Sequence, residues 1–125
     1  MEIVRAAWKA WQADDREASL APLHDDVEWH RSGDEPEVET LHGPGEIALM
    51  WAEWVGSFDE FRIEPLEFID AGERILVPFR MTGRLPGSDA EVAIEETHVY
   101  RFRDGKVVEV REYRTKEEAL AAVGL

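Results

Sequence analysis

The spacing of apolar residues changes from a helical period to a strand period about halfway along the chain. In the first half, apolar side chains recur every three or four residues, as at Ile3, Ala7, Trp8 and Trp11, which predicts helices with one buried face. In the second half, apolar and polar residues alternate, which is typical of half-buried strands. The pattern therefore predicts helices first and a sheet afterwards.

Three helices are expected before the sheet. The opening "MEIVRAAWKAWQADD" forms the first, and Asp14-Asp15 end it and offer a cap for a second helix that runs to about Leu23. The third helix starts at Gly43-Pro44, where proline suits the first turn, and ends near Gly56. Helices of this kind bury one face and need a partner surface.

The strands are separated by turn signals. A short strand, Val27 to Arg31, and an acidic loop, "SGDEPEVETLHG", precede the third helix. Four long antiparallel strands follow that helix, and they read "FRIEPLEFID", "RILVPFRMTGRL", "EVAIEETHVYRFR" and "KVVEVREYR". A capping box at Thr115 to Glu118 begins a short C-terminal helix that runs to about Ala122.

This order of elements predicts an α+β fold. A cone-shaped, strongly curved and mostly antiparallel sheet is expected to pack against the three N-terminal helices, with the short helix at the C-terminus. At 125 residues the chain suits one compact domain, residues 1–125. The cone would be open at one end.

Composition narrows the classes of partner and location. The apolar runs are too short to cross a bilayer, and no export signal opens the chain, so we expect a cytoplasmic protein without a membrane partner. The absence of cysteine excludes thiolate nucleophiles, disulfides and cysteine-bound metal centres. The net charge of −14 argues against nucleic acid, because phosphate backbones are bound by clustered Lys and Arg.

Several segments carry a family resemblance. They are the N-terminal helix pair, "LHDDVEWH", "HGPGEIALMWAEW", "EFIDAGERILV" and "HVYRFRDGKVVEVREYRTKEEAL". In these segments the chain resembles the nuclear transport factor 2-like superfamily, and within it the SnoaL-like polyketide cyclase and ketosteroid isomerase group. The resemblance implies a cone with a deep apolar pocket, a homodimer formed through the exposed sheet face, and reactions that include isomerisation, aldol cyclisation, dehydration and epoxide hydrolysis.

A two-residue turn at Asp104-Gly105 would set the register of the last hairpin. One sheet face would then carry eight alternate residues, namely Glu96, His98, Tyr100, Phe102, Val107, Glu109, Arg111 and Tyr113. The preceding hairpin would add Ile75, Val77, Phe79 and Met81 to it, and the opposite face would carry Arg80, Glu95, Thr97, Val99 and Val110. The first face is the more apolar one, so we expect it to line the pocket.

Four polar residues of this face are candidates for catalysis: Glu96, His98, Arg111 and Tyr113. A few polar groups against an apolar lining are the usual design of a small-molecule site, and imidazole exchanges protons near neutral pH. The alternative is structural. In that case Glu96 or Glu109 pairs with Arg111, and His98 and Tyr113 satisfy one another.

The resemblance also implies a candidate base on the strand Val27 to Arg31, across the pocket from these residues. In ketosteroid isomerases the catalytic carboxylate lies a few residues beyond a motif that resembles Asp25-Asp26, where this chain has His30, or Arg31 without a gap. A histidine can act as a base whereas an arginine cannot, so His30 is the candidate base. The oxyanion-donating tyrosine of their first helix is absent, and Trp8 and Trp11 stand there, which argues against steroid isomerase activity.

Aromatic residues at helix and strand spacing are either core or a lining that stacks on a flat ligand. The substrate-binding candidates are Trp8, Trp11, Trp51, Trp54, Phe79 and Tyr100. Trp29 alternates with His30 on its strand and must point the other way, into the core or a dimer interface.

Neither a metal nor a cofactor is expected. Glu96, His98 and His30 would have to converge to form a ligand set of two histidines and a carboxylate, and Glu-x-His on a strand is a weak signal for one. The sequence contains no phosphate loop, nucleophile elbow or dinucleotide fingerprint.

The leading hypothesis is a cofactor-independent acid–base enzyme that removes an activated C–H proton from a hydrophobic carbonyl compound. In this scheme His30 is the base, and His98 or Tyr113 polarises the carbonyl oxygen. Arg111 with Glu96 orients that donor. The main alternative is a non-catalytic small-molecule binding or accessory domain with the same pocket, and a third is an interaction-based dimer with a filled core.

Overall fold

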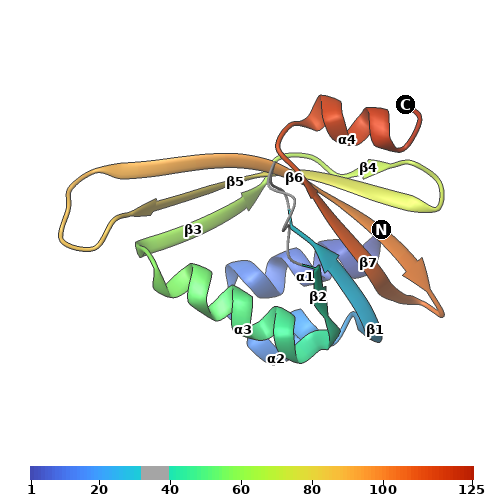
Figure 1. Cartoon of the computed structure of the whole chain (residues 1–125), viewed down its shortest axis with the longest axis horizontal. Helices are drawn as coiled ribbons and strands as arrows, with labels where there is room; N and C mark the ends of the chain where they lie inside the picture. Colours follow the sequence, from blue (N-terminus) through green and yellow to red (C-terminus); the bar gives the residue numbers. More distant parts are fainter. Residues whose placement is uncertain (32–39) are drawn as a thin grey trace.

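Figure 1 shows the computed structural model, which describes residues 1–31 and 40–125. The helices of this part of the chain are α1 (Glu2–Gln12), α2 (Arg16–Leu20), α3 (Gly43–Gly56) and α4 (Lys116–Ala122). The strands are β1 (Leu23–His30), β2 (Thr40–His42), β3 (Asp59–Pro65), β4 (Ile69–Asp70), β5 (Arg74–Arg84), β6 (Glu91–Arg103) and β7 (Lys106–Tyr113). All seven strands belong to one sheet.

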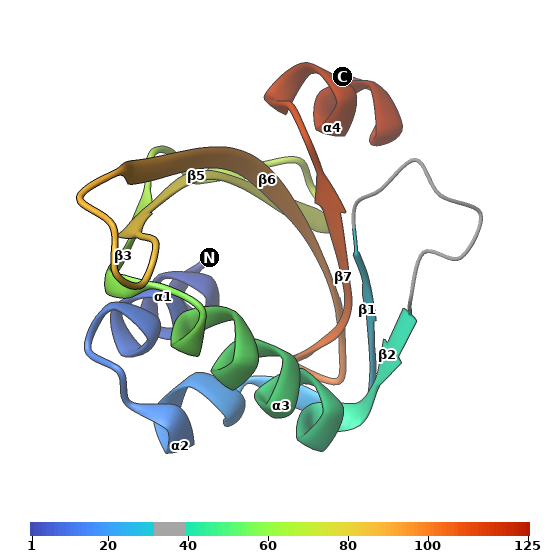
Figure 2. The same ribbon diagram turned by 60° about the vertical axis from the view of Figure 1, so that its left-hand side comes forward.

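The sheet is strongly curved and is not closed. Its order is β2-β1-β7-β6-β5-β3, with β4 paired to β5, and only β1 and β7 run parallel among the described pairs. Figure 2 shows α1, α2 and α3 gathered on the inner side of the curve and α4 on the outer side. We call these sides the concave and convex faces. The predicted α+β architecture is confirmed.

Local sequence sets the helix starts. An Asp15 carboxylate oxygen accepts a hydrogen bond from the backbone N–H of Ala18, and the Thr115 hydroxyl accepts one from Glu118, each at 3.1 Å. These bonds confirm the predicted caps of α2 and α4. The helix α2 is shorter than predicted because Leu23 already belongs to β1.

Two strand predictions change. Residues 40–42 of the predicted loop form β2 and pair with β1, while residues 32–39 of that loop lie outside the described part of the chain. The stretch "FRIEPLEFID" is divided into β3 and β4 instead of forming one strand. Pro65 has no N–H for the ladder, and the N–H of Leu66 donates to the carbonyl of Pro78 at 2.8 Å.

The last hairpin contains a bulge that the alternating pattern does not predict. The two-residue turn forms as expected, and Phe102 pairs with Val107. The register then shifts, because Arg101 pairs with Glu109 and Val108 becomes an extra residue on β7. From Glu109 onward, each β7 side chain therefore faces the side opposite to the predicted one.

The main core fills the space between the concave face and the helices. It includes Val4, Trp8, Val27, Trp29, Ile47, Ile63, Val77, Phe79, Tyr100 and Val110. A smaller cluster of Leu76, Val99 and Ala119 lies between the convex face and α4. In the described residues, no helix combines the length and apolar character needed to cross a membrane.

Candidate functional site

A small cavity lies between α3 and the concave face of the sheet. Its volume is about 40 Å³, and its lining combines aromatic, sulfur-containing and charged side chains. These are Trp29, Arg31, Met50, Trp51, Trp54, Phe79, Met81, Glu96, His98 and Glu112. We call it the inner cavity.

Trp51 lies where the inner cavity meets two other spaces. One is an apolar pocket of about 50 Å³ that shares Trp29 and Met50 with the inner cavity. The other is an open groove of about 750 Å³, lined by Trp51 together with Trp11 and Phe61. Sites for drug-sized ligands usually measure ~300–1,000 Å³, so the groove has the volume of such a site whereas the inner cavity is much smaller.

His98 lies at the centre of an aromatic cluster. Its side chain is buried, and its ring centroid is 4.4 Å from that of Phe79 and 5.0 Å from that of Trp29. Its Nδ1 atom is 2.7 Å from the Tyr100 hydroxyl. Burial lowers the pKa of His98 to about 3, so the imidazole is neutral at physiological pH.

Tyr100 lies behind His98 and is equally buried. Burial raises the pKa of its phenol well above the usual range, so the hydroxyl keeps its proton. The nearby indole N–H of Trp8 opposes this shift weakly, and its geometry does not complete a hydrogen bond with any described residue. Tyr100 and His98 therefore share a hydrogen bond between two neutral groups.

Two carboxylates and a guanidinium complete the polar lining of the inner cavity. Glu112 lies directly across from His98 in the pairing of β6 and β7, and it accepts a hydrogen bond from the indole N–H of Trp29. Glu96 is on the same face of β6 as His98, and Arg31 follows the end of β1. The cavity thus places a neutral imidazole beside acidic groups.

Arg111 and Tyr113 are not part of this site, contrary to the prediction. The bulge turns both toward the convex face, where the Arg111 guanidinium donates to Glu109 at 3.0 Å and Tyr113 packs beneath α4. Burial by itself raises the pKa of Glu109, but the ion pairs with Arg111 and Arg101 outweigh burial, so the pKa of this carboxyl lies below its usual value. Arg111 thus pairs with Glu109, as the structural alternative predicts, and the partner of His98 is Tyr100 instead of Tyr113.

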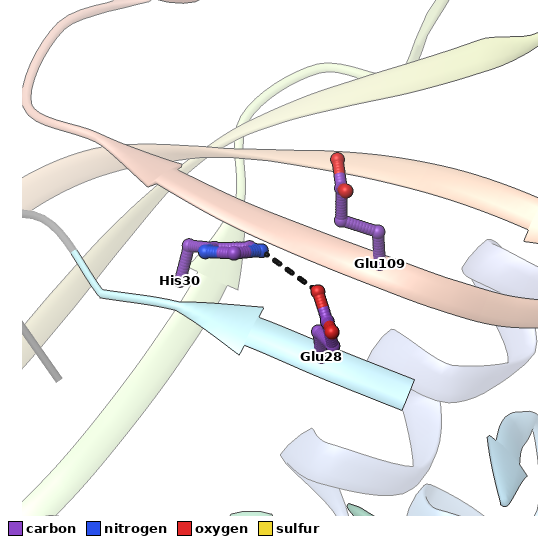
Figure 3. Close-up of side chains that lie close together, drawn as sticks. All are labelled: Glu28, His30 and Glu109. Atoms are coloured by element: carbon purple, nitrogen blue, oxygen red, sulfur yellow. Dashed lines mark ion pairs between the residues drawn. The ribbon is translucent and has the colours of Figure 1, made fainter. Parts of the chain in front are cut away.

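His30 does not face the inner cavity, so the predicted convergence of His30 and His98 is wrong. Trp29 contacts His98, and neighbouring residues of a strand point to opposite faces. Trp29 is thus a core residue, one of the two predicted alternatives. His30 lies on the convex face beside Glu28 and Glu109, with its Nε2 atom 3.4 Å from the Glu28 carboxylate (Figure 3).

Some of the predicted aromatic ligand-binding residues line a cavity or the groove, and the others are buried behind His98. Trp51, Trp54 and Phe79 line the inner cavity, and Trp11 lines the groove and the apolar pocket. Trp8 and Tyr100 are buried behind His98, and they contact it without lining either space.

Sequence reasoning missed Glu112 and Arg31 as lining residues. A signal for Glu112 is the adjacent pair Val107 and Val108, since both are buried and together they interrupt the alternation, as a bulge does. The signal for Arg31 is its position two residues after the inward Trp29. Weighing either signal requires knowing which face of β1 and β7 is covered.

Comparison with known proteins identifies the family and the fold of this chain. A model described as a SnoaL-like domain matches residues 4–110. An NTF2-like protein of unknown function from Burkholderia pseudomallei is 26% identical, with a TM-score of 0.78 over 100% of this chain and 97% of that chain. No curated protein matches this chain significantly in sequence.

Two further solved structures are similar in fold. A putative polyketide cyclase from Sinorhizobium meliloti is 23% identical, with a TM-score of 0.72 over 90% of this chain and 94% of its own. TerC, co-crystallised with polyporic acid, is 23% identical, with a TM-score of 0.75 over 99% of this chain and 97% of its own. On its sequence match and its curved helix-covered sheet, the chain belongs to the SnoaL-like domain family and has the NTF2-like fold.

Proposed function

We propose that the protein binds a flat, hydrophobic carbonyl compound above the inner cavity and catalyses enolisation of that compound by acid–base chemistry without a cofactor. The observation that supports this most is the neutral, buried His98, held by Tyr100 and placed across the sheet from the Glu112 carboxylate. A neutral donor and a carboxylate base are the two groups that proton abstraction next to a carbonyl needs.

His98 is the donor in this scheme. In this scheme the Tyr100 O–H donates to Nδ1, which leaves the ring proton on Nε2. A neutral imidazole N–H stabilises the enolate oxygen by a hydrogen bond and keeps its own proton. The low pKa of His98 therefore favours hydrogen-bond donation over proton transfer.

Glu112 is the base, in place of His30. Its carboxylate lines the inner cavity, and the Trp29 indole N–H holds one of its oxygens. Trp51, at the border between the groove and the inner cavity, turns aside to bring the substrate's C–H bond within reach. The aromatic lining suits a flat ring, and TerC, a protein of the same fold, crystallises with polyporic acid.

The test follows deuterium exchange at the activated position of 2-tetralone in D2O by NMR. We expect the protein to accelerate exchange, and we expect Glu112→Gln to lower the rate constant by a factor of roughly 10² or more. Glu95→Gln is the matched control, because Glu95 lies on the convex face of β6. Exchange that is unchanged in Glu112→Gln would remove Glu112 from the mechanism.

A non-catalytic binding domain is the second candidate. The small volume of the inner cavity favours it, because a ligand bound in the groove would not reach His98 and Glu112. Both functions predict a change in tryptophan fluorescence when 2-tetralone binds, but only the enzyme also accelerates deuterium exchange. A fluorescence change without accelerated exchange would support the binding domain and contradict the enzyme.

A further inference from the structure

Three metal-ligating side chains converge on the convex face, where β1 and β7 run side by side. Glu28, His30 and Glu109 each offer one ligand atom, and these atoms lie within 4.8 Å of one another; Figure 3 shows the three side chains. The pairing of β1 with β7 places Glu28 beside Glu109, and strand alternation puts His30 on the face of Glu28. The cluster therefore follows from the backbone itself.

His30 is oriented to present one ring nitrogen to this cluster. Its Nδ1 atom is 3.2 Å from the Thr40 hydroxyl oxygen, so Nδ1–H can donate there and leave the lone pair on Nε2. Nε2 is buried, makes no hydrogen bond with any described residue, and faces the Glu28 carboxylate at 3.4 Å. In that tautomer the Nε2 lone pair faces the Glu28 carboxylate, and a cation bound between the two atoms would remove their repulsion.

We propose that Glu28, His30 and Glu109 bind a divalent transition-metal ion, with Zn²⁺ as the best fit. Imidazole nitrogen with carboxylate oxygen is a ligand set that zinc accepts, and imidazole disfavours magnesium and calcium. Thr40 is the outer partner that fixes the ring of His30. His42 offers a second nitrogen, since its Nδ1 atom is 3.9 Å from the Glu28 carboxylate.

Two arginines limit the affinity of this site. Arg111 and Arg101 approach the Glu109 carboxylate at 3.0 and 3.4 Å. An ionised carboxylate has about four lone-pair positions, so Glu109 can keep Arg111 and still bind an ion. The nearby positive charge weakens that binding, and its removal should strengthen it.

The experiment is a calorimetric titration of chelator-treated protein with Zn²⁺, with Co²⁺ absorption as a second readout of coordination. We expect one ion per chain, with affinity weakened roughly tenfold or more by His30→Gln and by a smaller factor by Thr40→Val. Arg111→Gln should tighten binding severalfold. No turnover is measured, so the result is independent of the proposed enzyme.

His24→Gln is the matched control, because His24 lies on β1 outside the cluster and should leave the affinity unchanged. Melting temperatures in chelator establish that each variant is folded. The proposal is overturned if no ion binds at one per chain, or if His30→Gln binds Zn²⁺ as tightly as the unchanged protein.

Discussion

The strands β1 and β7 carry different chemistry on their two faces. On the concave face, Trp29 and Glu112 meet His98 among aromatic rings, and burial keeps that imidazole neutral. On the convex face, His30 lies beside Glu28 and near Glu109, in partial contact with water. Residue types are similar on both sides, so the covering of each face decides what a histidine can do.

Deletion of Val108 should have the largest effect on stability, because it removes the bulge that sets which β7 side chains lie on each face of the sheet. Arg111 would turn toward the apolar core and Glu112 toward the convex face. Burying an unpaired charge costs several kcal/mol, so we expect cooperative unfolding to be lost in thermal melts followed by circular dichroism.

Val108→Ala is the control for this deletion. It keeps the chain length and the register, so it should cost only about 1–3 kcal/mol. Equal melting curves for the deletion and for Val108→Ala would contradict the assignment of the two faces to the bulge.

The buried imidazole predicts a pH effect of the next size. Because the folded-state pKa of His98 is about 3 and the ordinary value is 6.5, the unfolded chain takes up the proton first as pH falls. The free energy of unfolding should therefore decrease from about pH 6.5 toward pH 3, by about 1.4 kcal/mol per pH unit from this group.

His98→Gln isolates that contribution, because Glu96 and Glu112 line the same cavity in both proteins. Urea unfolding at pH 7.5 and pH 5 should show the stability difference between the two proteins shrinking at the lower pH. A constant difference would mean that His98 is not held neutral by burial.

Trp29→Phe should have a moderate effect. It keeps most of the buried ring but removes the N–H that the Glu112 carboxylate accepts, which costs about 1–3 kcal/mol in a part-buried setting. Trp54→Phe is the matched control, because within residues 1–31 and 40–125 the Trp54 N–H donates only to the sulfur of Met81, a weak acceptor. Equal losses of stability in urea unfolding would contradict a specific role for the bond to Glu112.

The convex ion pair predicts the smallest effect. The Arg111 side chain is 46% exposed, so Arg111→Gln in chelator should cost at most about 1 kcal/mol, and less in high salt. Urea unfolding at two salt concentrations measures this. A larger loss of stability that does not depend on salt would contradict the view that the convex face, unlike the concave face, is open to solvent.

Sequence patterns predicted the faces of β5 and β6 correctly. Ile75 pairs with Tyr100, Val77 with His98 and Phe79 with Glu96, so these side chains share the concave face as expected. The same reasoning failed for Arg111 and Tyr113, because it carried one alternation through the bulge in β7. Selecting His30 over Arg31 failed for a related reason, since only packing shows that Trp29 points inward.

The sequence by itself determined the order of the helices and of the long strands β5, β6 and β7, the helix caps at Asp15 and Thr115, and the α+β class. These depend on contacts between residues close in the chain or on a repeated period. Only the tertiary structure decided which side chains meet. One extra residue, Val108, turns every later side chain of β7 to the opposite face of the sheet, and the alternating sequence pattern does not show this bulge. The tertiary structure also decided how full the cone is, since that depends on how Trp51 and its neighbours from distant segments pack together.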